Sequence, residues 1–133
     1  MTADDLPWLL TLCERRYSAR YDSKTTQAWY INLVLKNPQL YLAERTDHAF
    51  CITHIYVLPF TGKDIIADVM FLCAEEGTMW DTVRLMRSSI DWAKERNGRK
   101  WQIASDTDFD LTPLAKRVGA KFLAPRCVLD LKE

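Results

Sequence analysis

An apolar segment that runs directly into a long amphipathic helix constrains the fold of this chain most. Residues 68–74, Asp-Val-Met-Phe-Leu-Cys-Ala, have the length and composition of a buried strand. Residues 78–98 predict a helix, because apolar residues recur at steps of four, three, four and three, namely Met79, Val83, Met86, Ile90 and Ala93. Thr78 with Asp81 matches a capping box, and Asn97-Gly98 is typical of a helix exit.

The connection between this strand and helix is the first place to look for a ligand. It is only three residues long, Glu75-Glu76-Gly77. A strand that enters a helix through a tight turn points backbone N–H groups and the positive end of the helix dipole outward. A turn that merely joins two core elements fits the local pattern equally well.

The remaining elements predict a mixed sheet. Thr2 and Asp5 form a capping box that starts a first helix, and a second helix starts at Thr25 or Thr26 and ends before Asn37-Pro38. We expect strands at 40–44, 50–58, 65–73, 100–105, 120–123 and 126–131, and a short helix at 111–118.

Connection lengths then set the topology. The first three strands are joined too closely for crossovers, so they form an antiparallel meander, whereas the strand–helix–strand unit predicts a right-handed parallel crossover. The fold class is therefore α/β (α+β), with a mostly antiparallel central sheet and helices on both faces. Without repeats or linkers, residues 1–133 form a single domain.

Composition narrows the function. With 18 basic and 18 acidic residues the net charge is zero, so we expect no nucleic acid and no anionic membrane as partner. No apolar run approaches the roughly 20 residues of a membrane-spanning helix, and no leader is evident, which indicates a cytoplasmic protein. The four cysteines lack a C-x-x-C pair and predict buried, reduced thiols (Cys13, Cys51, Cys73 and Cys127). His48 and His54 are too few to complete a metal site.

This order of elements, with a helix that follows the central strand, resembles the GNAT (GCN5-related N-acetyltransferase) fold over nearly the whole chain. Residues 2–6 resemble the opening of GNAT domains, with the first strand truncated to a residue or two. The other matching segments are 85–87 and 91–98 in the helix after the coenzyme loop, 114–122 in the last helix and its "L-G-F" exit, and the closing strand at 129–131. The compact form is most similar to GNAT-like proteins of bacteriophages.

The resemblance implies acetyl-CoA as cofactor. Main-chain groups of the central strand would pair with the pantetheine arm, and these are Met70, Phe71 and Leu72. The loop after the strand would face the pyrophosphate, with Gly77, Thr78, Met79 and Trp80. Arg84 and Arg87, farther along the helix, are further candidates for a phosphate contact. However, the family signature Q/R-x-x-G-x-G/A is degenerate here. Aligned through Gly77, its first residue is Ala74 and its second glycine is Met79, and the loop carries two carboxylates.

The resemblance also implies a proton donor and a proton acceptor. A tyrosine that protonates the departing thiolate in the family corresponds to Ala115, with Tyr56 as a conceivable substitute. Asp68 is the first candidate for a general base and Asp106 the second. Each has an alternative, because Asp68 fits a solvated strand face and Asp106 fits a helix cap.

Two functions follow. The degenerate loop and missing tyrosine favour a non-catalytic scaffold, a phage-type virion or host-interaction protein in the host cytoplasm or virion, and the five tryptophans suit an interface with a protein partner. The alternative is an N-acetyltransferase that moves an acetyl group from acetyl-CoA to an amine. Both depend on a splayed gap between residues 69–73 and the parallel strand at 101–105.

Overall fold

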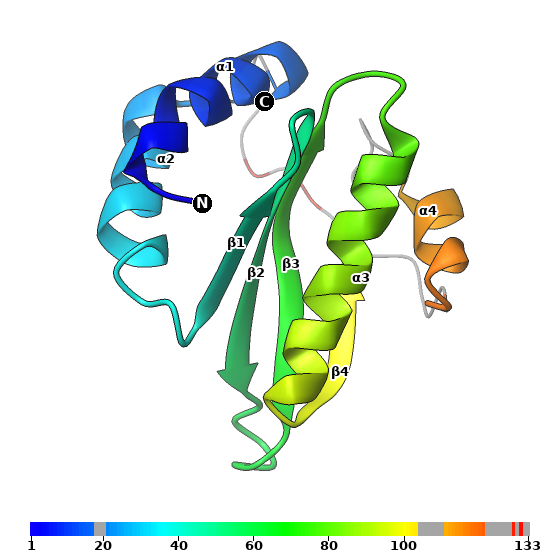
Figure 1. The fold of residues 1–133 in the computed structure, drawn as a ribbon. Helices are drawn as coiled ribbons and strands as arrows, with labels where there is room; N and C mark the ends of the chain where they lie inside the picture. The colour runs from blue at the N-terminus through cyan, green and yellow to red at the C-terminus, as the bar shows by residue number, and fades with distance from the viewer. Residues whose placement is uncertain (18–20, 104–110, 122–128, 130, 132–133) are drawn as a thin grey trace.

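A mixed sheet forms the centre of the molecule (Figure 1). The computed structural model describes residues 1–17, 21–103, 111–121, 129 and 131. Within these ranges the strand order is β1-β2-β3-β4, antiparallel from β1 to β3 and parallel between β3 and β4, as predicted. The strands are β1 (Tyr41–Arg45), β2 (Ala49–Val57), β3 (Ile65–Ala74) and β4 (Gly98–Ile103).

Helices cover both faces of this sheet, which confirms the α+β class. Figure 1 shows α1 and α2 on one side and α3 on the other, with α4 beside α3. The helical elements are η1 (Ala3–Asp5), α1 (Leu6–Tyr17), α2 (Ser23–Trp29), the π-helical turn η2 (Tyr30–Val34), α3 (Met79–Glu95) and α4 (Thr112–Arg117). None of the helices in the described ranges has the length and hydropathy needed to cross a bilayer. The strands predicted at 120–123 and 126–131 fall largely outside the described residues.

The helix caps confirm one prediction and correct two. The capping box at the N-terminus is present, since the Thr2 N–H donates to Asp5 Oδ2 at 2.8 Å. The box predicted at Thr78 is wrong, because the Thr78 hydroxyl donates back to the carbonyl of Glu75 at 2.6 Å instead of capping α3. The second helix begins at Ser23, two residues earlier than expected, because the Asp22 carboxylate accepts the exposed N–H groups of its first turn.

Two apolar layers sandwich the sheet. Because side chains alternate along a strand, β2 sends Phe50 and Ile52 toward α1 and Cys51 toward α3. The predicted buried thiols are confirmed for three cysteines that are free and buried, Cys13, Cys51 and Cys73, whereas Cys127 lies outside the described residues.

A buried hydrogen-bond chain fixes α3 on the sheet. The Ser89 hydroxyl of α3 accepts from Trp101 Nε1 of β4 at 2.9 Å and bonds Thr53 Oγ1 of β2 at 2.6 Å. Thr53 and Ser89 are both fully buried, and Thr53 Oγ1 also lies 3.7 Å from Cys51 Sγ, so these polar atoms find their partners within the protein. One side chain therefore sets the position of α3 relative to β2 and β4 together.

Replacing Ser89 tests this chain. In Ser89→Ala, the Trp101 N–H and the Thr53 hydroxyl lose a buried partner, so the free energy of unfolding is expected to fall by about 1–3 kcal/mol. Urea denaturation measures this change. Ser88→Ala is the matched control, because Ser88 is the neighbouring, partly exposed serine, and its substitution should change stability by less than about 0.5 kcal/mol. Equal losses in both variants would show that the chain does not stabilise the fold.

Candidate active site

The second half of β3 is only partly paired. Pairing with β4 runs from Ile65↔Gly98 to Val69↔Ile103, and residues 70–74 have no β4 partner among the described residues. Toward β2 the register shifts, because Thr53 pairs with Val69 and Ile52 with Phe71. Met70 is thus the extra residue of a β-bulge, a feature often found next to active sites. Residues 104 and 105 of the predicted gap lie outside the described ranges.

The open half of β3 leads into the turn before α3. Gly77 adopts φ 76°, a conformation that glycine reaches without steric cost, as a tight connection requires. Among the described residues no acceptor meets the N–H groups of Gly77 and Thr78, and the first N–H groups of a helix have no partner within it. With the positive end of the dipole of this 17-residue helix, the turn suits an anion.

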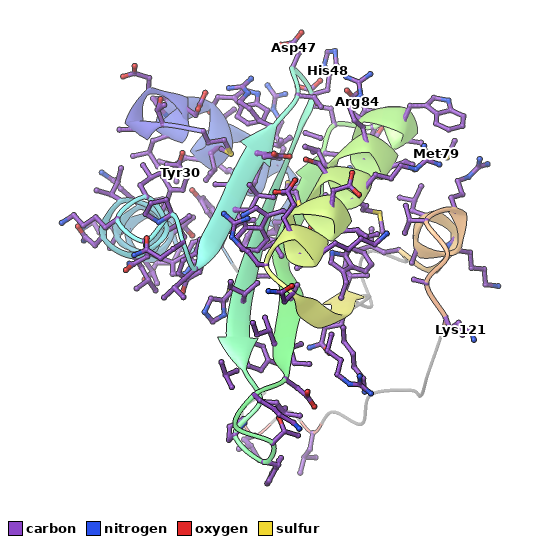
Figure 2. The ribbon with its side chains drawn as sticks, turned by 60° about the horizontal axis from the view of Figure 1, so that its bottom comes forward. Tyr30, Asp47, His48, Met79, Arg84 and Lys121 are labelled. Atoms are coloured by element: carbon purple, nitrogen blue, oxygen red, sulfur yellow. The ribbon has the colours of Figure 1, made fainter. Side chains whose placement is uncertain are left out.

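Each of the two carboxylates of this turn lies near a basic side chain from another element. Glu75 Oε2 lies 2.9 Å from His48 Nδ1, and Glu76 Oε1 lies 3.8 Å from Arg16 Nη1 of α1. Figure 2 shows His48 at the tip of the β1–β2 hairpin, at the same end of the sheet as Met79, where α3 begins. The Arg16 guanidinium therefore reduces the repulsion between Glu76 and an anionic ligand, and a protonated imidazole at His48 would do the same for Glu75.

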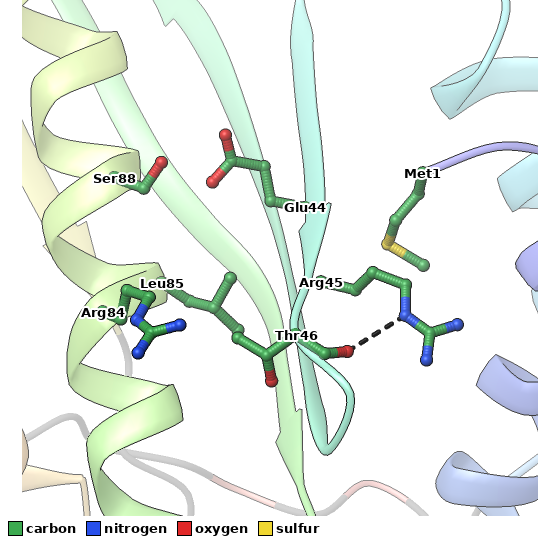
Figure 3. Close-up of a pocket in the computed structure, with 7 residues that line it drawn as sticks. All are labelled: Met1, Glu44, Arg45, Thr46, Arg84, Leu85 and Ser88. Carbon is green, nitrogen blue, oxygen red and sulfur yellow. Dashed lines mark hydrogen bonds between the residues drawn. The ribbon is translucent and has the colours of Figure 1, made fainter.

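The other predicted loop residues lie at the surface. Met79 and Trp80 are exposed, and the Trp80 ring lies 5.3 Å from the guanidinium carbon of Arg117 in α4. Arg84 lines a separate groove of about 400 Å³ between β1 and α3, and Figure 3 shows its guanidinium beside Leu85, directed from α3 toward Thr46. Arg84 is thus directed toward β1, which forms the edge of the sheet opposite to the β4 edge.

A row of polar side chains crosses the sheet below the bulge. Tyr41 pairs with His54, His54 with Asp68, and Asp68 with Gln102, so one residue from each strand lies in line. The Tyr41 and His54 rings stack at 4.6 Å, and Tyr56 lies 5.8 Å beyond. Burial raises the pKa of the Asp68 carboxyl, against the opposing effects of the hydrogen bond with Gln102 and the nearby His54.

The structure places Asp68 and Met70 on β3, and the turn directly follows that strand. Asp106 lies outside the described residues. Ala115 is partly buried against the core beneath α3, so the position of the family's tyrosine holds only a methyl group. Sequence reasoning missed Tyr17, whose hydroxyl donates to the Leu72 carbonyl at 3.4 Å. No local signal identifies this tyrosine, because the contact joins residues 55 positions apart.

We searched the described residues for side chains that could bind a metal ion together. In the described ranges, no group of three or more His, Cys, Asp and Glu residues has a geometry that would hold a metal ion.

Comparison with known proteins identifies the fold. No protein-family model matches the sequence, and no curated protein matches it significantly. The chain is similar to an acetyltransferase of Trypanosoma brucei, with 13% identity, coverage of 98% of this chain and 96% of that chain, and a TM-score of 0.77. It has the GNAT acetyltransferase fold.

Two further structures with this fold hold coenzyme. A predicted acetyltransferase of Clostridium acetobutylicum with acetyl-CoA is 20% identical, with coverage of 98% and 93% and a TM-score of 0.71. The aminoglycoside N-acetyltransferase AAC(6')-Iy in complex with CoA is 10% identical, with coverage of 99% and 91% and a TM-score of 0.75.

These similarities correct the function predicted from the sequence. The interpretation as a non-catalytic virion or host-interaction protein is wrong, because the matching structures include several acetyltransferases, two with coenzyme bound, and none points to a virion role. That prediction rested on the departure of the loop from the family signature and on Ala115 at the position of the tyrosine.

Asp68 is expected to reduce stability at neutral pH. Since its pKa is raised on folding, the unfolded chain releases this proton first, and stability falls as pH rises above the ordinary value of 3.8. Asp68→Asn should therefore raise the urea midpoint at pH 7, and the gain should vanish as pH falls toward 3.8. Asp91→Asn, at an exposed site on α3, is the control and should change nothing. A lower midpoint for Asp68→Asn at pH 7 would contradict this assignment.

Proposed function

We propose that this protein is an N-acetyltransferase that moves an acetyl group from acetyl-CoA to an amine. The observation that carries the proposal is the course of β3, which runs from Asp68 past the Met70 bulge and its open half to the turn before α3. At about 3.3 Å per residue, the six steps from Asp68 to Ala74 span roughly 20 Å. A base, an unpaired backbone edge and an anion site thus follow one another along a single extended segment.

The described residues fit the coenzyme. When bound, acetyl-CoA supplies an activated acetyl thioester. On the side of β4, the backbone at Met70 and Phe71 has no partner among the described residues, and it suits the amides of the pantetheine arm, as an added strand would. The N–H groups of residues 77–80 suit the pyrophosphate, and the ion pairs of Glu75 and Glu76 leave that turn compatible with negative charge.

Asp68 is the proposed general base. An ammonium group does not attack a carbonyl, so the acceptor must lose a proton before its nitrogen lone pair is available. Burial raises the pKa of this carboxyl, which makes it a stronger proton acceptor than an exposed aspartate.

Ala115 stands at the position of the tyrosine that protonates the departing thiolate in the family, so another residue must act as the proton donor. Tyr56, considered from the sequence, lies on β2 beyond His54. Tyr17 is better situated, because its hydroxyl reaches the carbonyl of Leu72 in the open half of β3. We therefore propose Tyr17 as the donor, with Tyr56 as the alternative. A single domain over residues 1–133 and a cytoplasmic location remain predictions.

Thermal shift with CoA and acetyl-CoA tests the binding turn. Ligand at 100-fold above its dissociation constant would stabilise the protein by about 2.7 kcal/mol. Gly77→Asp adds a carboxylate to the turn and should weaken binding about tenfold or more. Gly62→Asp is the matched control, because Gly62 has a similar φ of 66°, also has open space around a Cβ atom, and lies in the β2–β3 hairpin loop. Absence of a shift at millimolar coenzyme in the unmodified protein would contradict the proposal.

Release of CoA thiol in the presence of amines tests the chemistry. Asp68→Asn should lower the rate about 10²-fold or more, the size expected for a general base, with CoA binding retained. Asp91→Asn is the control on α3. Full activity of Asp68→Asn would assign the base elsewhere, and inactivity of the unmodified protein toward a broad panel of amines would count against an enzyme.

A further inference from the structure

His54 occupies the position beside Asp68 in the polar row. The two residues are direct Cα partners on β2 and β3, and directly opposed side chains on one face of an antiparallel pair have Cβ atoms about 4.5–5.5 Å apart. Both side chains are partly buried on the sheet face opposite α3. An imidazole and a carboxylate at this separation interact electrostatically whenever the imidazole is protonated.

Aromatic contacts on both sides hold the His54 ring. Tyr41 on β1 stacks against it with 4.6 Å between centroids and 23° between planes. Tyr56 lies on the other side, 5.8 Å away and tilted by 28°. Tyr41 is 9% exposed, so its ring is a firm support. The described hydrogen bonds include none that would direct His54 elsewhere, and stacking therefore sets the orientation of its ring.

We propose that His54, held by Tyr41, is a positioning residue that orients the Asp68 carboxylate and keeps it in its ionised, proton-accepting form. This inference rests on the proposed function for its consequence in catalysis, but the coupling of the two side chains is a property of the free protein. Asp68 needs such a partner because burial alone disfavours its charge. Gln102 complements His54 from the other side by a hydrogen bond with the same carboxyl.

Among the described residues of this face, His54 is the basic side chain directly opposite Asp68. Tyr41, Tyr56 and Gln102 carry no basic side chain. Lys100 on β4 pairs with Ile66, a position diagonal to Asp68, and its side chain is exposed. The nearby His54 affects the pKa of the Asp68 carboxyl, and the direction of that effect is downward.

Carbon-13 NMR of the Asp68 carboxyl tests the coupling without any substrate. Asp68→Asn identifies the signal by its loss. In His54→Gln the midpoint of the Asp68 titration is expected to rise by about one pH unit, because a nearby opposite charge shifts a pKa by about 1–3 units. Tyr41→Leu, which keeps an apolar side chain but removes the ring, should raise the midpoint in the same direction. Tyr41→Phe keeps the ring and is the matched control, with no change expected.

An unchanged Asp68 midpoint in both folded variants, His54→Gln and Tyr41→Leu, would overturn the inference. Kinetics provide a second readout: His54→Gln should lower kcat and move the acid limb of the pH–rate profile upward, with the KM for acetyl-CoA unchanged. Failure of the proposed function has a different signature. Absence of acetyltransferase activity in the unmodified protein, or full activity of Asp68→Asn, would refute the catalytic role of Asp68. The effect of His54 on the Asp68 titration would then still be seen by NMR.

Discussion

The molecule depends on β3, which pairs with β2 from Ile65 to Ala74 and, within the described residues, with β4 only over its first half. From Ile65 to Val69 the strand is bonded to β2 and to β4, which anchors the centre of the sheet. Beyond Val69 the bulge at Met70 shifts the register with β2, and the described partner on β4 ends. Within the described residues, the backbone of β3 beyond Val69 therefore has no partner on the side of β4, at the point where the strand approaches α3. Fold and candidate chemistry meet in this one strand.

The position of α3 follows from packing on the sheet and from one buried polar contact. Ser89 bonds residues of β2 and β4, so the helix, the central strands and the parallel edge move as one unit. The burial of apolar side chains stabilises the packing of α3 on the sheet, since Val83, Leu85 and Met86 are nearly inaccessible to solvent. The hydrogen bonds add direction, because a buried donor without a partner is costly and only one helix position satisfies all three groups. This fixes where the N-terminus of α3 points.

Charge at the turn before α3 is balanced by residues that are distant in sequence. His48 comes from the β1–β2 hairpin and Arg16 from α1, and each meets one of the two adjacent glutamates. Exposed ion pairs of this kind contribute little to stability. Their effect here is on the local potential at the turn, where the Arg16 guanidinium lies near Glu76 and the His48 imidazole lies near Glu75. A loop that departs from a sequence signature thus keeps the backbone groups on which anion binding relies.

Local sequence patterns determined the elements and their faces. Periodicity predicted α3 and the β strands, the Thr2 and Asp5 pair predicted the first cap, and the context of Cys13, Cys51 and Cys73 predicted their burial, because each depends on residues a few positions apart. Tertiary structure alone decided the bulge at Met70, the partners of the turn glutamates, the contact of Tyr17 with β3, and the row from Tyr41 to Gln102. These depend on strand register and on contacts between distant segments, where a shift of one residue would turn Asp68 to the other face of the sheet, and no local pattern encodes that choice.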